Sequence, residues 1–381
     1  MRIARNLLLF IIAIAATLLQ CGCSRLPITA PLPQNLEARR LAGVDPDTPM
    51  AISPDGKVAA VSSSGMKLIH LPSGQLLEVD SRLPRRVAWS PGGYGLAASF
   101  SADGGSSIVT YDQYGIRVAE ERVEGKITDL AWLSEREILA ASISITNYKF
   151  GSNYATRLHR WSPGLGGVTT VDLRQTTLQP ATIRHWLPLL QRGPRLDLSP
   201  DKGVILYLQP MDPPLFNPNY KLILRDLASG REMEVVNLPW NSDGGRFSAD
   251  GELMFHGDGG GNTTLRDPWS GETVATLPGS GRNLELSPVG GYRFSDGTLY
   301  RDDKVVTELA EGSRACFNPN GRELLVSAGK ELYLVSGLQP EGSRLLTTAQ
   351  REKLLQPRSW RLEGLISPKE YRETLERIKR Q

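Results

Sequence analysis

The sequence predicts an all-β fold, a seven-bladed β-propeller with a short C-terminal helical tail. A turn motif related to Ser-Pro-Asp-Gly returns seven times, and apolar segments of strand length flank each copy. The copies divide residues 50–340 into units of roughly 42 residues, which falls within the ~40–45 residues of a propeller blade. One four-stranded blade cannot bury both of its faces, whereas blades arranged radially cover one another. A β-sandwich, the alternative all-β arrangement, does not predict seven equal units.

The first 23 residues predict a signal sequence rather than a part of the fold. Arg2 and Arg5 precede an apolar run of 13 residues, from Leu7 to Leu19. This run is too short for a helix to span the ~30 Å of a bilayer core, and its length suits the apolar region of a secretory signal.

Two cysteines follow the apolar run, at positions 21 and 23, and this placement resembles the lipobox of bacterial lipoproteins. The resemblance implies a lipid on the cysteine thiol, and hence a membrane-anchored protein of the cell envelope that faces the periplasm or the exterior. Cys23 fits better because the small residue Gly22 precedes it, and Cys21 is the alternative. An ordinary signal peptide with incidental cysteines also accounts for the pattern. Residues 24–48 carry four prolines and are predicted to form a tether.

The turn motif defines the propeller domain, predicted at residues 49–340. Pro presets the backbone at the second position of such a turn, Ser or Asn can cap the turn with its side chain, and Gly permits the exit. The seven copies begin at Ile52, Trp89, Trp132, Leu198, Phe247, Leu286 and Phe317, and the third copy is degenerate.

Apolar segments complete each unit to four strands, of which the third is the clearest. The third strands are predicted at 67–71, 107–111, 157–161, 221–225, 264–266, 298–301 and 331–335. The seventh unit lacks a clear fourth strand. Either residues 343–348 or residues 36–44 could supply that strand and close the ring.

The Ser-Pro-Asp-Gly turn at 53–56 and the Asp-x-x-Ser-Gly turns at 226–230 and 267–271 resemble the WD40-like PD40 repeats of bacterial TolB-type propellers. The resemblance covers residues 50–340 and implies the propeller fold, whereas its motifs indicate little about function. The Trp-Asp and Gly-His pairs of eukaryotic WD40 blades are absent from the sequence.

Residues 341–381 change pattern and predict a helical tail. The segment Ser367–Glu370 is a capping box with Pro at the first helical position, and Tyr371, Leu375 and Ile378 follow at helical spacing. The string LEGLISPKEYRETLERI resembles the short C-terminal SHOCT motif, which implies association with another chain. Packing of the helix against the rim of the propeller is the alternative.

The sequence shows no recognisable reaction chemistry, so we expect a protein that is not an enzyme and that uses no cofactor or metal. The four histidines stand singly, without the close spacing of metal ligands. The Gly-x-Ser-x-Gly motif of serine hydrolases is absent from the sequence. A net charge of +3 over 381 residues gives no sign of nucleic-acid binding.

The longest predicted loops lie in the third and fourth units. In a blade with strands a to d, the b–c loops and the d–a crossovers emerge on one face, and the a–b and c–d turns on the other. The loops at 146–155 and 209–220 and the crossover at 174–194 should therefore meet on one face. Their aromatic content is typical of protein-binding surfaces, although mutual packing of the loops is the alternative. The candidate patch consists of Tyr148, Phe150, Tyr154, His185, Trp186, Met211, Phe216 and Tyr220.

These features together predict a membrane-anchored, non-catalytic propeller that acts as a protein-interaction platform in the bacterial envelope, with envelope proteins as partners. The alternative is a ligand-binding or enzymatic propeller that uses its central channel for a carbohydrate or a quinone. A ring of charged or polar side chains pointing into the channel, together with a bound metal or sugar, would favour that alternative.

Overall fold

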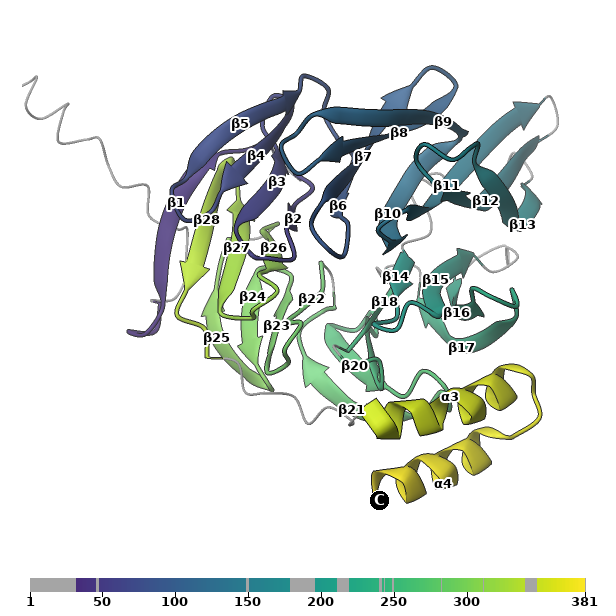
Figure 1. Ribbon diagram of the computed structural model, residues 1–381. Coiled ribbons are helices and arrows are strands. Elements are labelled where there is room, and N and C mark those ends of the chain that lie inside the picture. The colour runs from purple at the N-terminus through teal and green to yellow at the C-terminus, as the bar shows by residue number, and fades with distance from the viewer. Residues whose placement is uncertain are drawn as a thin grey trace, which may run out of the picture.

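The computed structural model describes residues 32–45, 48–148, 151–178, 196–210, 219–239, 242, 244–248, 250–281, 283–310, 312–339 and 348–380. The strands of these residues form seven four-stranded antiparallel sheets, arranged radially as blades around a centre (Figure 1). The predicted seven-bladed β-propeller is confirmed, and each predicted third strand is the third strand of its blade.

Blades 1 to 3 consist of consecutive strands, which we call a to d from the centre outward. Blade 1 comprises β2 (Ala51–Ile52), β3 (Val58–Ser62), β4 (Met66–His70) and β5 (Gln75–Asp80). Blade 2 comprises β6 (Arg86–Trp89), β7 (Gly95–Ala102), β8 (Gly105–Asp112) and β9 (Arg117–Glu124). Blade 3 comprises β10 (Lys126–Ser134), β11 (Glu137–Tyr148), β12 (Gly151–Trp161) and β13 (Thr169–Leu178).

Blades 4 to 6 follow the same order. Blade 4 comprises β14 (Leu196–Leu198), β15 (Val204–Pro210), β16 (Asn219–Asp226) and β17 (Glu232–Pro239). Blade 5 comprises β18 (Gly245–Phe247), β19 (Met254–Gly257), β20 (Asn262–Arg266) and β21 (Thr273–Pro278). Blade 6 comprises β22 (Glu285–Leu286), β23 (Tyr292–Ser295), β24 (Thr298–Arg301) and β25 (Lys304–Glu308).

Blade 7 is built from both ends of the propeller sequence. Its strands a to c are β26 (Arg314–Phe317), β27 (Glu323–Ala328) and β28 (Glu331–Ser336), and its outer strand is β1 (Glu37–Gly43). Because an unpaired outer edge of β28 would expose its backbone groups, pairing with β1 closes the ring. The N-terminal candidate therefore supplies the last strand, and the predicted start of the propeller at residue 49 is corrected. The predicted tether loses residues 37–43 to the sheet, and residues 1–31, with Cys21 and Cys23, lie outside the described residues.

The repeated turn motif joins strands a and b. In blade 1 the Ser53 hydroxyl donates to Asp55 Oδ1 at 2.6 Å and accepts the Val58 N–H at 3.0 Å. The turn glycines also contact the preceding blade. At Gly251, with φ of +73°, an added Cβ would lie 3.0 Å from Cδ of Pro200 in the turn of blade 4. Glycine is therefore required both for the left-handed backbone and for the close approach of adjacent turns.

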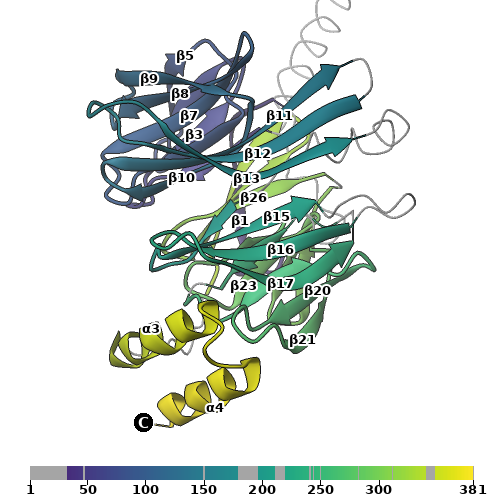
Figure 2. The ribbon, with the colours of Figure 1, turned by 90° about the vertical axis from the view of Figure 1, so that its right-hand side faces the viewer.

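The C-terminal tail forms two helices, α3 (Thr348–Leu362) and α4 (Pro368–Lys379), beside β17 and β21 (Figures 1 and 2). The predicted capping box begins α4, with reciprocal hydrogen bonds between Ser367 and Glu370. Tyr371, Leu375 and Ile378 are buried in one apolar cluster with side chains of blades 4 and 5. The described structure thus places the tail against the propeller, as in the second of the two sequence interpretations, and these side chains are not available to another chain. Among the described residues, no helix has the length and hydrophobicity required to span a bilayer.

Candidate binding site in the central channel

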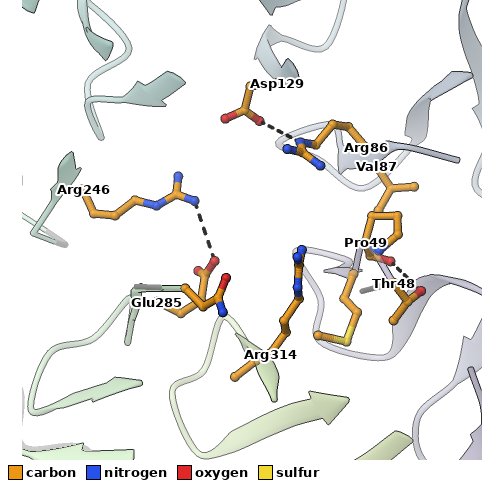
Figure 3. A pocket seen from close by; sticks show the side chains of 11 residues that line it. Thr48, Pro49, Arg86, Val87, Asp129, Arg246, Glu285 and Arg314 are labelled. Carbon is orange, nitrogen blue, oxygen red and sulfur yellow. Dashed lines mark hydrogen bonds and ion pairs between the residues drawn. The ribbon is translucent and has the colours of Figure 1, made fainter. Parts of the chain in front are cut away.

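A cavity of about 200 Å³ opens at the centre of the ring, where the a strands begin. Figure 3 shows arginine and carboxylate side chains that point into it from several blades. Its lining comes from the start of β6, β22 and β26, from β10 and β18, and from the segment before β2. The lining residues are Thr48, Pro49, Met50, Arg86, Val87, Asp129, Arg246, Asn283, Glu285, Arg314 and Ala315.

Short innermost strands place these side chains in the channel. All four residues of β6 and both residues of β22 are only partly buried, whereas four of the five residues of β3 are buried. The b and c strands lie between neighbouring blades and carry the apolar core. The a strands have one edge on the channel, so charged side chains are tolerated there.

Arg246 of β18 lies between two carboxylates. Its Nη1 is 3.0 Å from Asp197 Oδ1 of blade 4, and its Nη2 is 3.7 Å from Glu285 Oε1 of blade 6. Desolvation acts to lower the pKa of Arg246, but the Glu285 and Asp197 carboxylates outweigh it and raise the pKa above its ordinary value. The guanidinium therefore stays charged and joins three consecutive blades.

A second pair lies between blades 2 and 3. Arg86 Nε donates to the Thr128 carbonyl at 2.7 Å and lies 4.0 Å from Asp129 Oδ1. Asp129 also accepts the Leu196 N–H of blade 4 at 2.9 Å. Asp197 likewise accepts the Phe247 N–H of blade 5 at 2.6 Å. The channel carboxylates therefore hold neighbouring a strands together in addition to giving the cavity its charge.

The cavity lining combines both signs of charge. Three arginines and two carboxylates line it, so the lining is positive by one charge at neutral pH, and Asp197 behind Arg246 compensates that charge. The side chains of Arg86 and Asp129 remain 32% and 18% exposed, and Glu285 is 39% exposed. Arg314 extends into the cavity from the side opposite Asp129 (Figure 3). A polar or charged group that enters the channel mouth would meet these side chains first.

Sequence reasoning did not find this site, although the sequence contains a signal for it. Asp197, Arg246 and Glu285 each stand two residues before the Ser of the turn motif, in strands that are otherwise apolar at that end. Aligning the copies on that Ser, or on Asn318 in the seventh copy, would have placed the three charges at one level of the channel.

The described residues include only a part of the sequence-predicted patch. Tyr154 and Tyr220 are 2% and 7% exposed, so their inclusion in an exposed patch was wrong. The predicted loop 146–155 is an extension of β11 and β12, which pair as far as Tyr148 and Gly151. Strand pairing buries Tyr154, and the apolar cluster of blades 4 and 5 takes up Tyr220. Phe150, His185, Trp186, Met211 and Phe216 lie outside the described residues.

The channel cavity and the β11–β12 hairpin share one face of the ring. The cavity lies where the d–a crossovers enter the a strands, which is the face that also carries the b–c connections. The tail lies on the other face, because side chains of α3 line one pocket together with Pro200 and Gly251 in the a–b turns of blades 4 and 5, and Arg358 of α3 donates to Glu252 in the turn of blade 5. Figure 2 shows the hairpin and the helices on opposite sides of the ring.

Two isolated titratable groups, His159 and Cys316, lie within the sheets. His159 is 2% exposed and contacts the hydroxyls of Ser142 at 2.7 Å and Thr170 at 3.0 Å. Burial, with a contribution from the Arg157 charge, lowers the pKa of His159 to about 4. Burial raises the pKa of the Cys316 thiol to about 12. The described residues contain no group of three His, Cys, Asp or Glu side chains arranged as metal ligands.

Comparisons with known proteins show the fold. No family model and no curated protein sequence matches the chain. The Dos1 propeller matches with a TM-score of 0.53 and 12% identity, over 82% of this chain and 97% of that one. The β-propeller domain of Cps50 (Swd1) from Myceliophteria thermophila matches with a TM-score of 0.52 and 11% identity, over 82% and 99% of the two chains. At this identity the similarity establishes a shared β-propeller fold.

Proposed function

We propose that this protein is a non-catalytic β-propeller of the bacterial envelope that binds a partner protein at the mouth of its central channel. The observation that carries the proposal is the ring of arginines and carboxylates around a partly open cavity. Anchorage by a lipid on Cys23, and with it the envelope location, rests on the sequence pattern of residues 1–23.

The size of the cavity favours a side chain of a partner over a free ligand. Sites for drug-sized molecules enclose about 300–1,000 Å³, whereas this cavity measures about 200 Å³. A carbohydrate or quinone, the alternative occupant of the channel, exceeds this space. One inserted side chain fits it.

Two of the arginines in the cavity favour a carboxylate on that side chain. Arg86 and Arg314 both extend toward the open centre (Figure 3), and a guanidinium presents a planar fork of donors that matches a carboxylate. Charge-assisted hydrogen bonds of this kind are about twice as strong as neutral ones. The carboxylates Asp129 and Glu285 at the rim would then orient basic or amide groups beside the inserted acid.

The described tail helices leave this face open. They occupy the opposite face at blades 4 and 5, so they do not compete with a partner at the channel mouth. Rigid scaffolds that present a cavity among loops are typical of binding domains.

Affinity purification of the full-length protein from cross-linked, solubilised membranes tests the proposal. The variants are Arg314→Gln and Arg86→Gln, with Arg136→Gln as the matched control, because Arg136 is exposed in the a–b turn of blade 3 on the opposite face. We expect both channel variants to recover at least about tenfold less of the partner, since a lost charged hydrogen bond costs about 1.5–3 kcal/mol. Equal recovery by all four proteins, at unchanged melting temperature, would contradict the proposal.

Two further measurements separate the parts of the proposal. Native mass spectrometry of the purified protein would reveal a bound carbohydrate or quinone as a discrete added mass, and such a mass would favour the alternative function. Fractionation of cells that express Cys23→Ser or Cys21→Ser tests the anchor. Loss of membrane association with Cys23→Ser alone supports lipidation at that residue, and retention by both variants argues against a lipid anchor.

A further inference from the structure

The interface between blades 5 and 6 differs from the other six. Within the described residues, a cluster of buried apolar side chains fills each of the interfaces 1–2, 2–3, 3–4, 4–5, 6–7 and 7–1. None of these clusters joins blade 5 to blade 6. A cavity of about 530 Å³ lies there instead.

The walls of this cavity are apolar on the side of blade 5. Phe255 and Leu265 are cross-strand partners on β19 and β20, and Leu277 lies on the adjacent strand β21. All three line the cavity and are only partly buried. In the other interfaces, the equivalent surface is covered by the next blade.

Blade 6 contributes an arginine in place of an apolar side chain. Tyr292 and Phe294 of β23 belong to the cluster with blade 7, so strand alternation turns Arg293 toward blade 5. Arg293 is 3% exposed, and its guanidinium carbon lies 3.9 Å from the centre of the Tyr300 ring.

The Arg293 guanidinium has no hydrogen-bond partner in the described structure. Nε, Nη1 and Nη2 are all buried and all unsatisfied. Desolvation lowers the pKa of Arg293 below its ordinary value. The negative charge of Asp303 acts in the opposite direction and raises the pKa, but Asp303 forms no hydrogen bond with the guanidinium. A buried cation whose hydrogen bonds are all unmade is unfavourable. The contact with Tyr300 offsets only a part of this cost.

We propose that the cavity between blades 5 and 6 binds a small monocarboxylate with an apolar body, whose carboxylate pairs with Arg293. The apolar body would cover Phe255, Leu265 and Leu277. The Arg293 guanidinium, which is buried behind the cavity wall in the described structure, would turn toward the carboxylate and donate two of its unmade hydrogen bonds. The volume lies within the about 300–1,000 Å³ of small-molecule sites.

The acidic side chains of the cavity restrict the charge of the ligand. Asp250, Asp302 and Asp303 also line it, and they would repel any negative charge that does not pair with Arg293. A phosphate dianion or a dicarboxylate is therefore a poorer ligand than a monocarboxylate. This site is separate from the channel, so its test is independent of the proposed function.

Binding of decanoate to the purified chain, measured by calorimetry and by thermal shift, tests the proposal. Decanol serves as the neutral ligand of the same length. We expect decanoate to bind and to raise the melting temperature, and decanol to bind about tenfold to a hundredfold more weakly, because it cannot form the charge-assisted pair. Failure of decanoate to bind at about 1 mM, or equal binding of decanol, would overturn the proposal.

Substitutions of cavity residues test whether decanoate binds at Arg293. Arg293→Met should abolish decanoate binding and should raise the melting temperature of the unliganded protein, because it removes a buried charge whose hydrogen bonds are unmade. Arg301→Met is the matched control, since Arg301 lies over Tyr292 in the same blade but does not line the cavity. It should leave binding unchanged. A lower melting temperature of Arg293→Met together with unchanged binding would show a structural role and refute the site.

A second variant covers the case in which Arg293→Met does not fold. Leu277→Trp fills the cavity from blade 5 and keeps Arg293. It should reduce decanoate affinity at least about tenfold, and unaltered affinity would place decanoate elsewhere.

Discussion

The ion pair between the tail and blade 5 allows a quantitative prediction. Arg358 Nη2 donates to Glu252 Oε1 at 2.6 Å, and both side chains are only 9% exposed. Arg358 also lies over the Trp269 ring, 5.2 Å from its centre. Replacing Arg358 by Met keeps an unbranched apolar stem in place of the guanidinium and leaves the Glu252 carboxylate buried without its cation.

The expected loss follows from the burial of the pair. Removing one partner of a buried pair costs about 3–5 kcal/mol, because the remaining charge is uncompensated. The loss has a ceiling, since the tail can undock and return Glu252 to water. The apolar contacts of Leu354, Tyr371, Leu375 and Ile378 oppose undocking, each by about 1.5–3 kcal/mol. We therefore expect a loss of about 3 kcal/mol or more in Arg358→Met, and recovery of most of it in the Arg358→Met/Glu252→Met double variant.

Urea denaturation and hydrogen exchange measure the two parts of this prediction. The urea midpoint reports the stability, and exchange of the amides in 348–380 reports docking of the tail. Arg231→Met is the control, because the pair of Arg231 with Glu363 is exposed and surface pairs contribute about 0–1 kcal/mol. A loss below about 1 kcal/mol in Arg358→Met, with unchanged tail exchange, would refute the reasoning. A double variant no more stable than the single one would refute it as well.

Three further predictions concern the ring. Gly321→Ala should lose about 1–3 kcal/mol more stability than Gly329→Ala. Both glycines have positive φ, but only a Cβ at position 321 would overlap Val289. Equal urea midpoints of the two variants would contradict this prediction. His159 has a folded pKa of about 4, so the stability that its neutral form contributes is complete above pH 6.5 and is lost as pH falls toward 4. The loss reaches about 3 kcal/mol, and His159→Asn should flatten the pH dependence of the urea midpoint between pH 7 and 4. A chain that begins at residue 44 lacks β1 and should melt lower and aggregate relative to one that begins at residue 32, whereas equal melting would exclude closure by β1.

The architecture was predictable because the signals repeat. The turn motif and the third strands recur seven times, so an error in one copy is corrected by the others. The c strand β28, for example, has four buried residues in a row. Closure was not decided by the sequence, because β1 is an outer strand with only one buried residue, Ala42. The sequence of such an exposed strand resembles that of a tether.

The two candidate sites escaped prediction for two different physical reasons. The a strands β18 and β22 are three and two residues long, too short to show an alternation that would place Arg246 and Glu285 in the channel. Arg293 alternates with apolar neighbours, which normally indicates a solvent-exposed face. Its burial depends on the partner blade, and no local pattern carries that information. For Tyr154 the error was the reverse. An extended hairpin was interpreted as a loop, so the side chain was expected to be exposed, and it is buried.

The tail and the cavity between blades 5 and 6 share one structural element, the a–b turn of blade 5. Ser248 and Asp250 of this turn line the cavity, and Glu252 at its end holds the tail through Arg358. A ligand that orders the turn therefore favours docking of the tail, and by reciprocity docking of the tail favours the ligand by the same factor. Decanoate should slow hydrogen exchange in α3 of the wild type, and Arg358→Met should weaken decanoate binding. Equal affinity in both proteins would show that blade 5 keeps the turn in place without the tail. In that case, the closed ring holds the turn in place without the tail, at the interface of blades 5 and 6 that the described side chains leave unfilled.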